Sequence, residues 1–169
     1  MEDENLKSQN TCFYSSFLFL INTTICWYYG YFIYASLFFA LFVTSIIVHS
    51  YTNIYTILID KISIISVVLY GGYVFLKKIR EPGDIERCVG RQSEASGVYS
   101  EVCPTHGDHI EKLVHGVLIV YTFIVTLYLY YIGFLYNSYC FCENPIVANM
   151  WHSFLHLVSC IGHGMIVCL

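Results

Sequence analysis

Apolar residues dominate this chain in long blocks that polar residues interrupt at only a few places. A helix that crosses a hydrocarbon core of about 30 Å needs roughly 20 apolar residues, and each block reaches or approaches that length. A polar segment at residues 77–112 divides the blocks into two groups. The pattern predicts an all-α, polytopic transmembrane helical bundle, a single membrane domain (1–169) of about five spans at 11–28, 30–49, 54–76, 113–136 and 146–168.

Aromatic residues mark the boundary between the first two spans. The sequence "WYYGY", residues 27–31, is typical of an interfacial aromatic belt, with Gly30 at a turn. The amino terminus, "MEDENLK", has more acidic than basic residues before the first apolar block, which is the reverse of a secretory signal peptide. We therefore expect residues 11–28 to be a retained membrane span.

Composition leads to the same class of protein. Hydrophobic residues make up 57% of the chain and charged residues only 12%, and the mean hydropathy is +0.60. This is more apolar than a soluble domain of the same size. The net charge is -4, and no basic face is available to neutralise phosphates, so nucleic acid is not expected as a partner.

The basic residues predict an orientation. Six of the eight lie within or at the edges of residues 77–112: Lys77, Lys78, Arg80, Arg87, Arg91 and Lys112. The positive-inside rule places this loop in the cytoplasm, which puts the amino terminus on the exoplasmic side. We expect an integral protein of an endomembrane (ER or Golgi) or of the plasma membrane.

Ionisable residues inside spans are costly and usually functional. His49 ends the second span on the exoplasmic side, Asp60 lies about two turns into the third, and His152 and His156 lie two and three turns into the last. With the predicted topology, these four residues from three spans lie at a similar depth in one leaflet. They are therefore able to meet.

The spacing of these residues predicts a metal site. His152 and His156 are four positions apart, so their rings share one helical face, and His49 supplies a third imidazole. Three protein ligands with water in the fourth position are typical of catalytic zinc. Asp60 could be a fourth ligand, or could hydrogen-bond the water and take its proton. Ser45, one turn before His49, could orient that ligand or donate to an oxyanion.

The order of these residues resembles the CREST superfamily of membrane hydrolases, which includes the alkaline ceramidases, the adiponectin and progestin receptors and the lipid-remodelling factors of GPI anchors. The alkaline ceramidases are the most similar group. Their Ser-x3-His-x10-Asp motif corresponds to "SIIVHSYTNIYTILID", residues 45–60, and their His-x3-His motif to "HSFLHLVSCIG", residues 152–162.

The resemblance implies a zinc-dependent amidase that cleaves a ceramide-like membrane lipid by metal-activated water. It implies that three histidines hold Zn²⁺, that Asp60 positions or deprotonates water, and that Ser45 supports the site; the histidines are His49, His152 and His156. Family members usually have seven spans, so this chain would be a shortened form, and an oligomer or partner protein could complete it. Lys61 stands where the ceramidases often have a second acid.

Each residue also has a simpler interpretation. His49 could be an interfacial polar residue, Asp60 could pair with Lys61 or cap a helix, and Ser45 could serve close helix packing. His163 returns to nearly the same face, about 10 Å deeper than His156, so we interpret it as a packing residue or substrate contact. The alternative function is a receptor-like or structural membrane protein, with or without the metal.

The polar loop and the thiols offer weaker candidates. Cys88, Cys103, His106 and His109 have zinc-ligand chemistry without a known finger spacing. Cys140 and Cys142 are too close in sequence for an unstrained mutual disulfide, although each could pair elsewhere. No cysteine has a neighbouring motif that would make it a nucleophile.

Overall fold

Every regular element in the described part of the chain is a helix. The computed structural model describes residues 11–80 and 106–169. Four helical segments in these ranges are long and apolar enough to cross a membrane: Phe32–Ser50, Ile54–Arg80, Ile110–Phe141 and Pro145–Cys168. The predicted all-α membrane bundle is confirmed, and the chain is an integral membrane protein.

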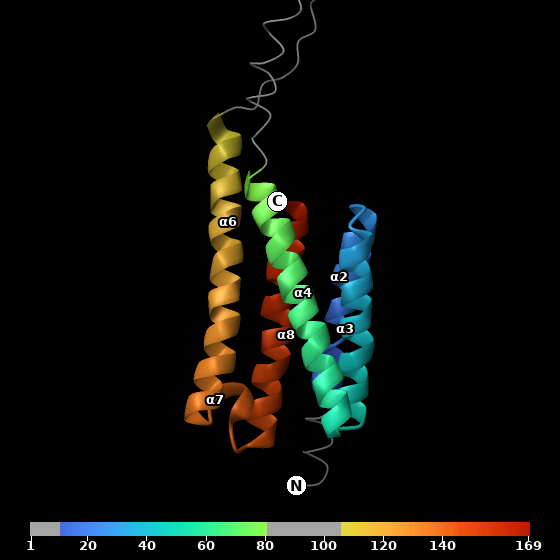
Figure 1. The fold of residues 1–169 in the computed structure, drawn as a ribbon. Helices are drawn as coiled ribbons and strands as arrows, with labels where there is room; N and C mark the ends of the chain where they lie inside the picture. The colour runs from blue at the N-terminus through green and yellow to red at the C-terminus, as the bar shows by residue number, and fades with distance from the viewer. Residues whose placement is uncertain (1–10, 81–105) are drawn as a thin grey trace, which may run out of the picture.

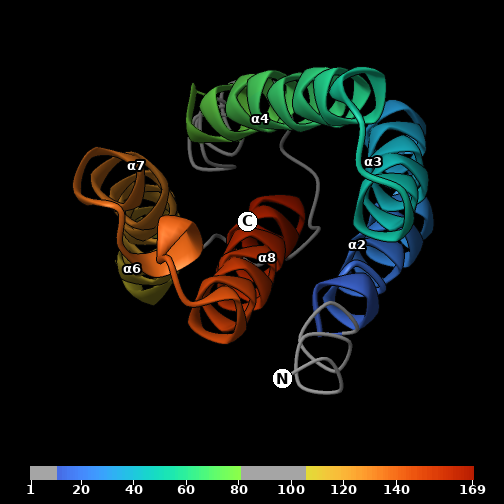
Figure 2. The same ribbon diagram turned by 90° about the horizontal axis from the view of Figure 1, so that it is seen from below.

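The last helix, α8 (Pro145–Cys168), stands at the centre of the bundle (Figure 1). On one side of it, α2 (Leu18–Tyr28), α3 (Phe32–Ser50) and α4 (Ile54–Arg80) form an arc, and α6 (His106–Leu127) lies on the other side, as Figure 2 shows. We call the end where α4 finishes and α6 begins the linker end, and the opposite end, where α8 begins, the turn end.

The first expected span is not one continuous helix. Residues 11–15 are helical, the chain turns at Ser16 and Phe17, and α2 follows with 11 residues, about 16 Å in length. Backbone amides at the turn bond back three residues, from Phe17 to Tyr14 and from Phe19 to Ser16, both at 3.1 Å. Serine hydroxyls that bond to nearby carbonyls compete with regular helix, and Ser16 Oγ donates to the carbonyl of Cys12 at 3.0 Å.

A tight turn joins α2 to α3. Gly30 has a φ of +78°, in the left-handed region that glycine adopts without a steric penalty. The amide of Tyr31 closes this turn on the carbonyl of Cys26 at 2.8 Å. The turn expected at Gly30 is confirmed, and it places α2 antiparallel to α3.

The turn end is built from irregular helix. After α6, the chain continues as a π-helix, η1 (Tyr128–Ile132), then α7 (Gly133–Tyr136) and the 3₁₀ turn η2 (Tyr139–Phe141). Asn137 and Tyr139 have φ values of 49° and 51° and reverse the chain toward α8. The side chain of Asn144 caps α8 by accepting from Ile146 N at 3.0 Å, and Pro145 occupies the first turn. The cap sets where α8 begins.

Two glycines allow helices to approach α8 closely. Tyr34 of α3 and His163 of α8 are buried and hydrogen-bonded to each other through the hydroxyl and Nδ1. Gly71 of α4 lies against this pair, and a Cβ there would be 2.8 Å from His163 Nδ1. On the other side of α8, a Cβ at Gly162 would clash with the hydroxyl of Thr122 in α6.

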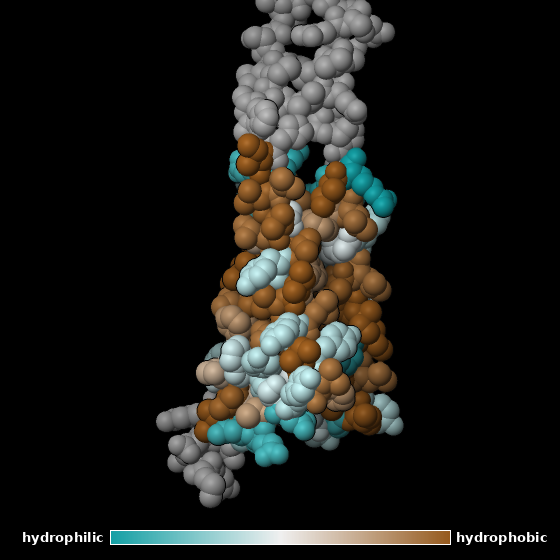
Figure 3. All heavy atoms as spheres, turned by 90° about the vertical axis from the view of Figure 1, so that its left-hand side faces the viewer, coloured by the Kyte–Doolittle hydropathy of each residue, from teal (hydrophilic) through white to brown (hydrophobic). Residues whose placement is uncertain are grey.

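The outer surface suits a hydrocarbon environment. Figure 3 shows the face that α6 presents as hydrophobic over most of its length, with paler residues toward the turn end. Leu113, Val117 and Ile124 of α6 are 68%, 60% and 57% exposed. Such exposure would be costly in water and is expected where lipid covers the surface.

Adjacent glycines in α4 give a test of this packing. We expect Gly72→Ala to raise stability by about 0.5–1 kcal/mol, because alanine favours helix and a Cβ there meets nothing within 4 Å. Gly71→Ala should lower it by about 1–3 kcal/mol, because the new methyl displaces His163 and Tyr34. Thermal unfolding in detergent measures both variants, and a stabilising Gly71→Ala would contradict the packing.

Candidate metal centre

Three imidazoles from two helices converge at the turn end of the bundle. One ligand atom from each of His49, His152 and His156 can be chosen so that all three lie within 4.8 Å of one another. The ring centroid of His49 lies 5.3 Å from that of His152 and 5.7 Å from that of His156. The centroids of His152 and His156 are 4.8 Å apart. The three histidines expected to meet lie together, whereas Asp60, the fourth residue expected there, is not in this group.

Local structure explains the placement of each ring. His49 lies in the last turn of α3, directly before the short connection to α4. The Asn144 cap begins α8 so that His152 and His156 fall in its third and fourth turns, one above the other on the same face. His156 is buried at 6% exposure, whereas the other two rings are partly exposed. The group therefore has a buried side and an accessible side.

Ser15 orients His156. The hydroxyl of Ser15 donates its hydrogen to the carbonyl of Cys12 at 2.9 Å, and its oxygen lies 2.8 Å from His156 Nδ1. When the single hydroxyl hydrogen of Ser15 is given to Cys12, the second contact requires His156 to donate from Nδ1–H. That tautomer leaves the Nε2 lone pair of His156 available for a metal. The sequence interpretation had not included Ser15.

The segment before α2 is tied to both helices of the histidine group. Cys12 Sγ donates to the Asn149 carbonyl of α8 at 3.3 Å. Because Ser16 gives its hydroxyl hydrogen to the Cys12 carbonyl, the 2.8 Å contact between Ser16 and Ser45 is donated by Ser45. The adjacent serines in an apolar block were the only sequence signal for this support.

Ser45 joins α3 to the segment before α2. It is buried, with 2% exposure, and its hydroxyl hydrogen is used in the bond to Ser16. A residue held in this way fixes α3 against the segment before α2. Donation to a developing oxyanion would require that bond to break.

Asp60 is placed beside α3 and is not a member of the histidine group. Its Oδ1 accepts from the hydroxyl of Thr44 at 3.2 Å. Thr44 precedes His49 by five residues, about 7.5 Å along the helix axis. Thr44 is also about 140° around the helix from His49, so the carboxylate contacts a different face of α3.

Two nearby ionisable residues have other partners. Lys61 Nζ donates to the hydroxyl of Tyr130 at 2.8 Å and lies 4.7 Å from the centroid of its ring. His163 is bonded to Tyr34, so it acts as a packing residue, one of the two roles expected for it. Lys61 thereby joins α4 to the π-helix η1 across the bundle.

The weaker candidates from the sequence are the loop residues Cys88, Cys103, His106 and His109 and the two thiols Cys140 and Cys142. Cys88 and Cys103 lie outside the described residues, and so do the side chains of His106 and His109. Cys140 and Cys142 are free thiols, as are the other described cysteines, Cys12, Cys26, Cys160 and Cys168.

The donor set fits zinc chemically. Three neutral imidazoles are a ligand set that zinc prefers at catalytic sites. Two nitrogens bound at about 2.1 Å in a tetrahedral site are about 3.4 Å apart, so the ligand atoms, which lie within 4.8 Å of one another, would need to move closer by up to about 1.4 Å.

Comparisons with known protein families, curated proteins and solved structures give no match to this chain.

The role of Ser15 can be tested by removing its hydroxyl. We expect Ser15→Ala to weaken zinc binding by roughly 10–100-fold, because the partner that fixes the His156 tautomer is lost. Ser36→Ala is the control, because the Ser36 hydroxyl is exposed and bonds only within α3. Competition with a chelator of known zinc affinity measures both. Equal affinities in the two variants would show that Ser15 does not orient the ligand.

Proposed function

We propose that this protein is a zinc-dependent membrane hydrolase that cleaves a lipid amide, similar to the alkaline ceramidases. The observation that carries the proposal is the convergence of His49 with His152 and His156, which are about a hundred residues apart in the sequence. Isolated histidines in apolar helices have many possible roles. Three histidines whose ligand atoms lie close together, with Ser15 beside Nδ1 of His156, favour a metal ligand set.

The number of ligands favours catalysis over a purely structural metal. Structural zinc sites are usually closed by four protein ligands, and the group in the described residues contains three. When bound at such an open site, zinc activates a water molecule and polarises a carbonyl group. The partly exposed sides of His49 and His152 leave room for a substrate to approach.

Asp60 is the proposed proton-transfer residue. An acidic residue within a membrane span is costly and tends to have a function. Thr44 engages Oδ1, which leaves Oδ2 to accept a proton from water and to return it to the leaving amine. In the reaction, the water oxygen joins the carbonyl carbon while the C–N bond breaks, so the products are a fatty acid and an amine.

The surroundings support a lipid as substrate. The histidine group lies inside a bundle whose outer surface is apolar, so a substrate dissolved in the bilayer can approach laterally. Its place near one end of the spans matches the depth of the polar linkage of a membrane lipid. The motifs at residues 45–60 and 152–162, which resemble those of the ceramidases, favour an amide and a ceramide-like lipid among such linkages.

Metal content tests the first half of the proposal. We expect protein purified in detergent to contain about one zinc per chain, and His152→Ala and His156→Ala to lose most of it, because two imidazoles bind zinc poorly. His115→Ala, on α6 and outside the histidine group, is the control that should keep its zinc. Elemental analysis gives the metal-to-protein ratio. Equal zinc in all four proteins would refute the metal site.

Turnover tests the second half. We expect the zinc-loaded protein to release fatty acid from ceramide, and Asp60→Asn to reduce the rate by roughly 10²–10⁴-fold while retaining zinc, because the amide preserves the Thr44 contact but is not a base. Mass spectrometry of released fatty acid measures the rate. Intact zinc without turnover of any lipid amide would favour the receptor-like or structural alternative.

A further inference from the structure

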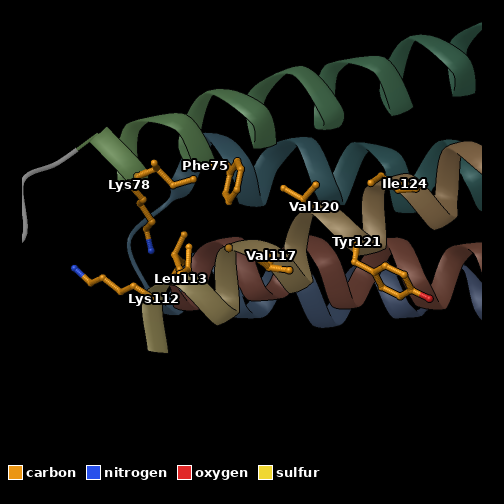
Figure 4. Close-up of a pocket in the computed structure, with 11 residues that line it drawn as sticks. Phe75, Lys78, Lys112, Leu113, Val117, Val120, Tyr121 and Ile124 are labelled. Carbon is orange, nitrogen blue, oxygen red and sulfur yellow. The ribbon is translucent and has the colours of Figure 1, made fainter. Parts of the chain in front are cut away.

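A groove opens between α4 and α6 at the linker end, away from the histidine group. It has a volume of about 610 Å³, within the range of roughly 300–1,000 Å³ typical of ligand pockets. Figure 4 shows apolar side chains of both helices facing it, with a lysine from each helix at one end. The groove is lined mainly by Phe75, Leu113, Val117, Val120, Tyr121 and Ile124.

The groove is as long as one leaflet is thick. Its lining extends along α6 from Leu113 to Ile124, eleven residue steps, or about 16 Å. Half of a hydrocarbon core of about 30 Å is about 15 Å. One acyl chain that runs from the headgroup level to the midplane would therefore lie along its whole length.

The mouth of the groove is positively charged. Lys78 Nζ donates to the Val167 carbonyl of α8 at 2.7 Å, which holds the ammonium group in place and leaves two of its three N–H donors. Lys112 approaches the same mouth from α6 (Figure 4). If the basic residues set the orientation as expected, this end faces the cytoplasm, where anionic lipids are concentrated.

We propose that this groove binds one anionic phospholipid, with an acyl chain along α6 and its phosphate between Lys78 and Lys112. Charge complementarity selects this occupant, because an apolar helix of a partner or of a second copy would leave two ammonium groups without an anion. The groove does not reach the histidine group, because its lining ends at Ile124 and Lys61 joins α4 to Tyr130 of η1 nearer the turn end. The lipid in the groove is therefore a bound cofactor of the bundle and is distinct from the proposed substrate. This inference does not depend on the proposed hydrolase activity.

Native mass spectrometry of the full chain tests the proposal with two probes that share their acyl chains, dioleoyl-phosphatidylglycerol and dioleoyl-phosphatidylcholine. We expect the parent protein to prefer phosphatidylglycerol, and the double variant Lys78→Gln/Lys112→Gln to lose roughly thirtyfold in affinity for it alone, as two lysines near an anionic headgroup would contribute. Lys77→Gln, which removes one positive charge directly beside Lys78 but outside the lining of this groove, should keep the preference.

A second pair of variants tests the apolar part. Gly116 lines the groove and a Cβ there meets nothing within 4 Å, so Gly116→Phe should fill the groove and reduce binding of both lipids. Gly72→Phe, at a glycine that is equally open but is not part of the lining, is the control and should bind both as the parent does. Equal binding of the two lipids by the parent protein would overturn the proposal. So would equal losses in Lys77→Gln and the double variant, or a dimer that Gly116→Phe abolishes.

Discussion

The rotation of α8 about its own axis is the constraint on which the rest of the structure depends. In a bilayer, apolar side chains gain little by facing another helix instead of lipid, so the apolar residues of α8 do not decide which face turns inward. Polar groups do, because each costs free energy if it faces hydrocarbon without a partner. His156 bonds to Ser15, His163 bonds to Tyr34, and the Cys160 carbonyl accepts from Asn22 Nδ2 at 3.0 Å. These contacts with the first segment, α2 and α3 fix one rotation of α8.

The same constraint connects the buried core with the proposed site. His156 and His163 are seven positions apart, so they lie on nearly the same face of α8. The hydrogen bond between Tyr34 and His163, which lies toward the linker end, therefore also directs His152 and His156 toward the last turn of α3 at the turn end. Gly71 contributes to this arrangement from α4, since a larger residue would press on His163. Packing residues that never approach the proposed metal still decide whether the three imidazoles meet.

Sequence reasoning could predict the parts that depend on pattern and spacing. Apolar blocks predicted the helices, Gly30 the first turn, and the His-x3-His spacing with His49 the histidine group. It could not predict the break near Ser16, because a hydroxyl that interrupts a helix and one that merely points sideways look the same in a sequence. Sequence reasoning also could not predict the partner of Lys61. Asp60 is its neighbour in the sequence, but Lys61 donates to Tyr130, which is 69 residues away. The role of Ser15 depends on a contact across 141 residues, which no local pattern encodes.

The polar and aromatic contact of α8 with α2 and α3 differs from the open groove between α4 and α6, and this difference separates the two proposed sites. Toward α2 and α3, hydrogen bonds and buried aromatic rings draw the helices together, and the imidazoles lie at the end of that contact. Between α4 and α6, the lining of the groove is mainly apolar over about one leaflet, and polar contacts at its two ends are made by Lys78, to α8, and by Lys61, to η1. An apolar gap within a bilayer does not fill with water, so lipid is its natural occupant. The tightly packed side provides the rigidity that convergent ligands require, while the open side leaves a lipid-sized space that need not disturb them.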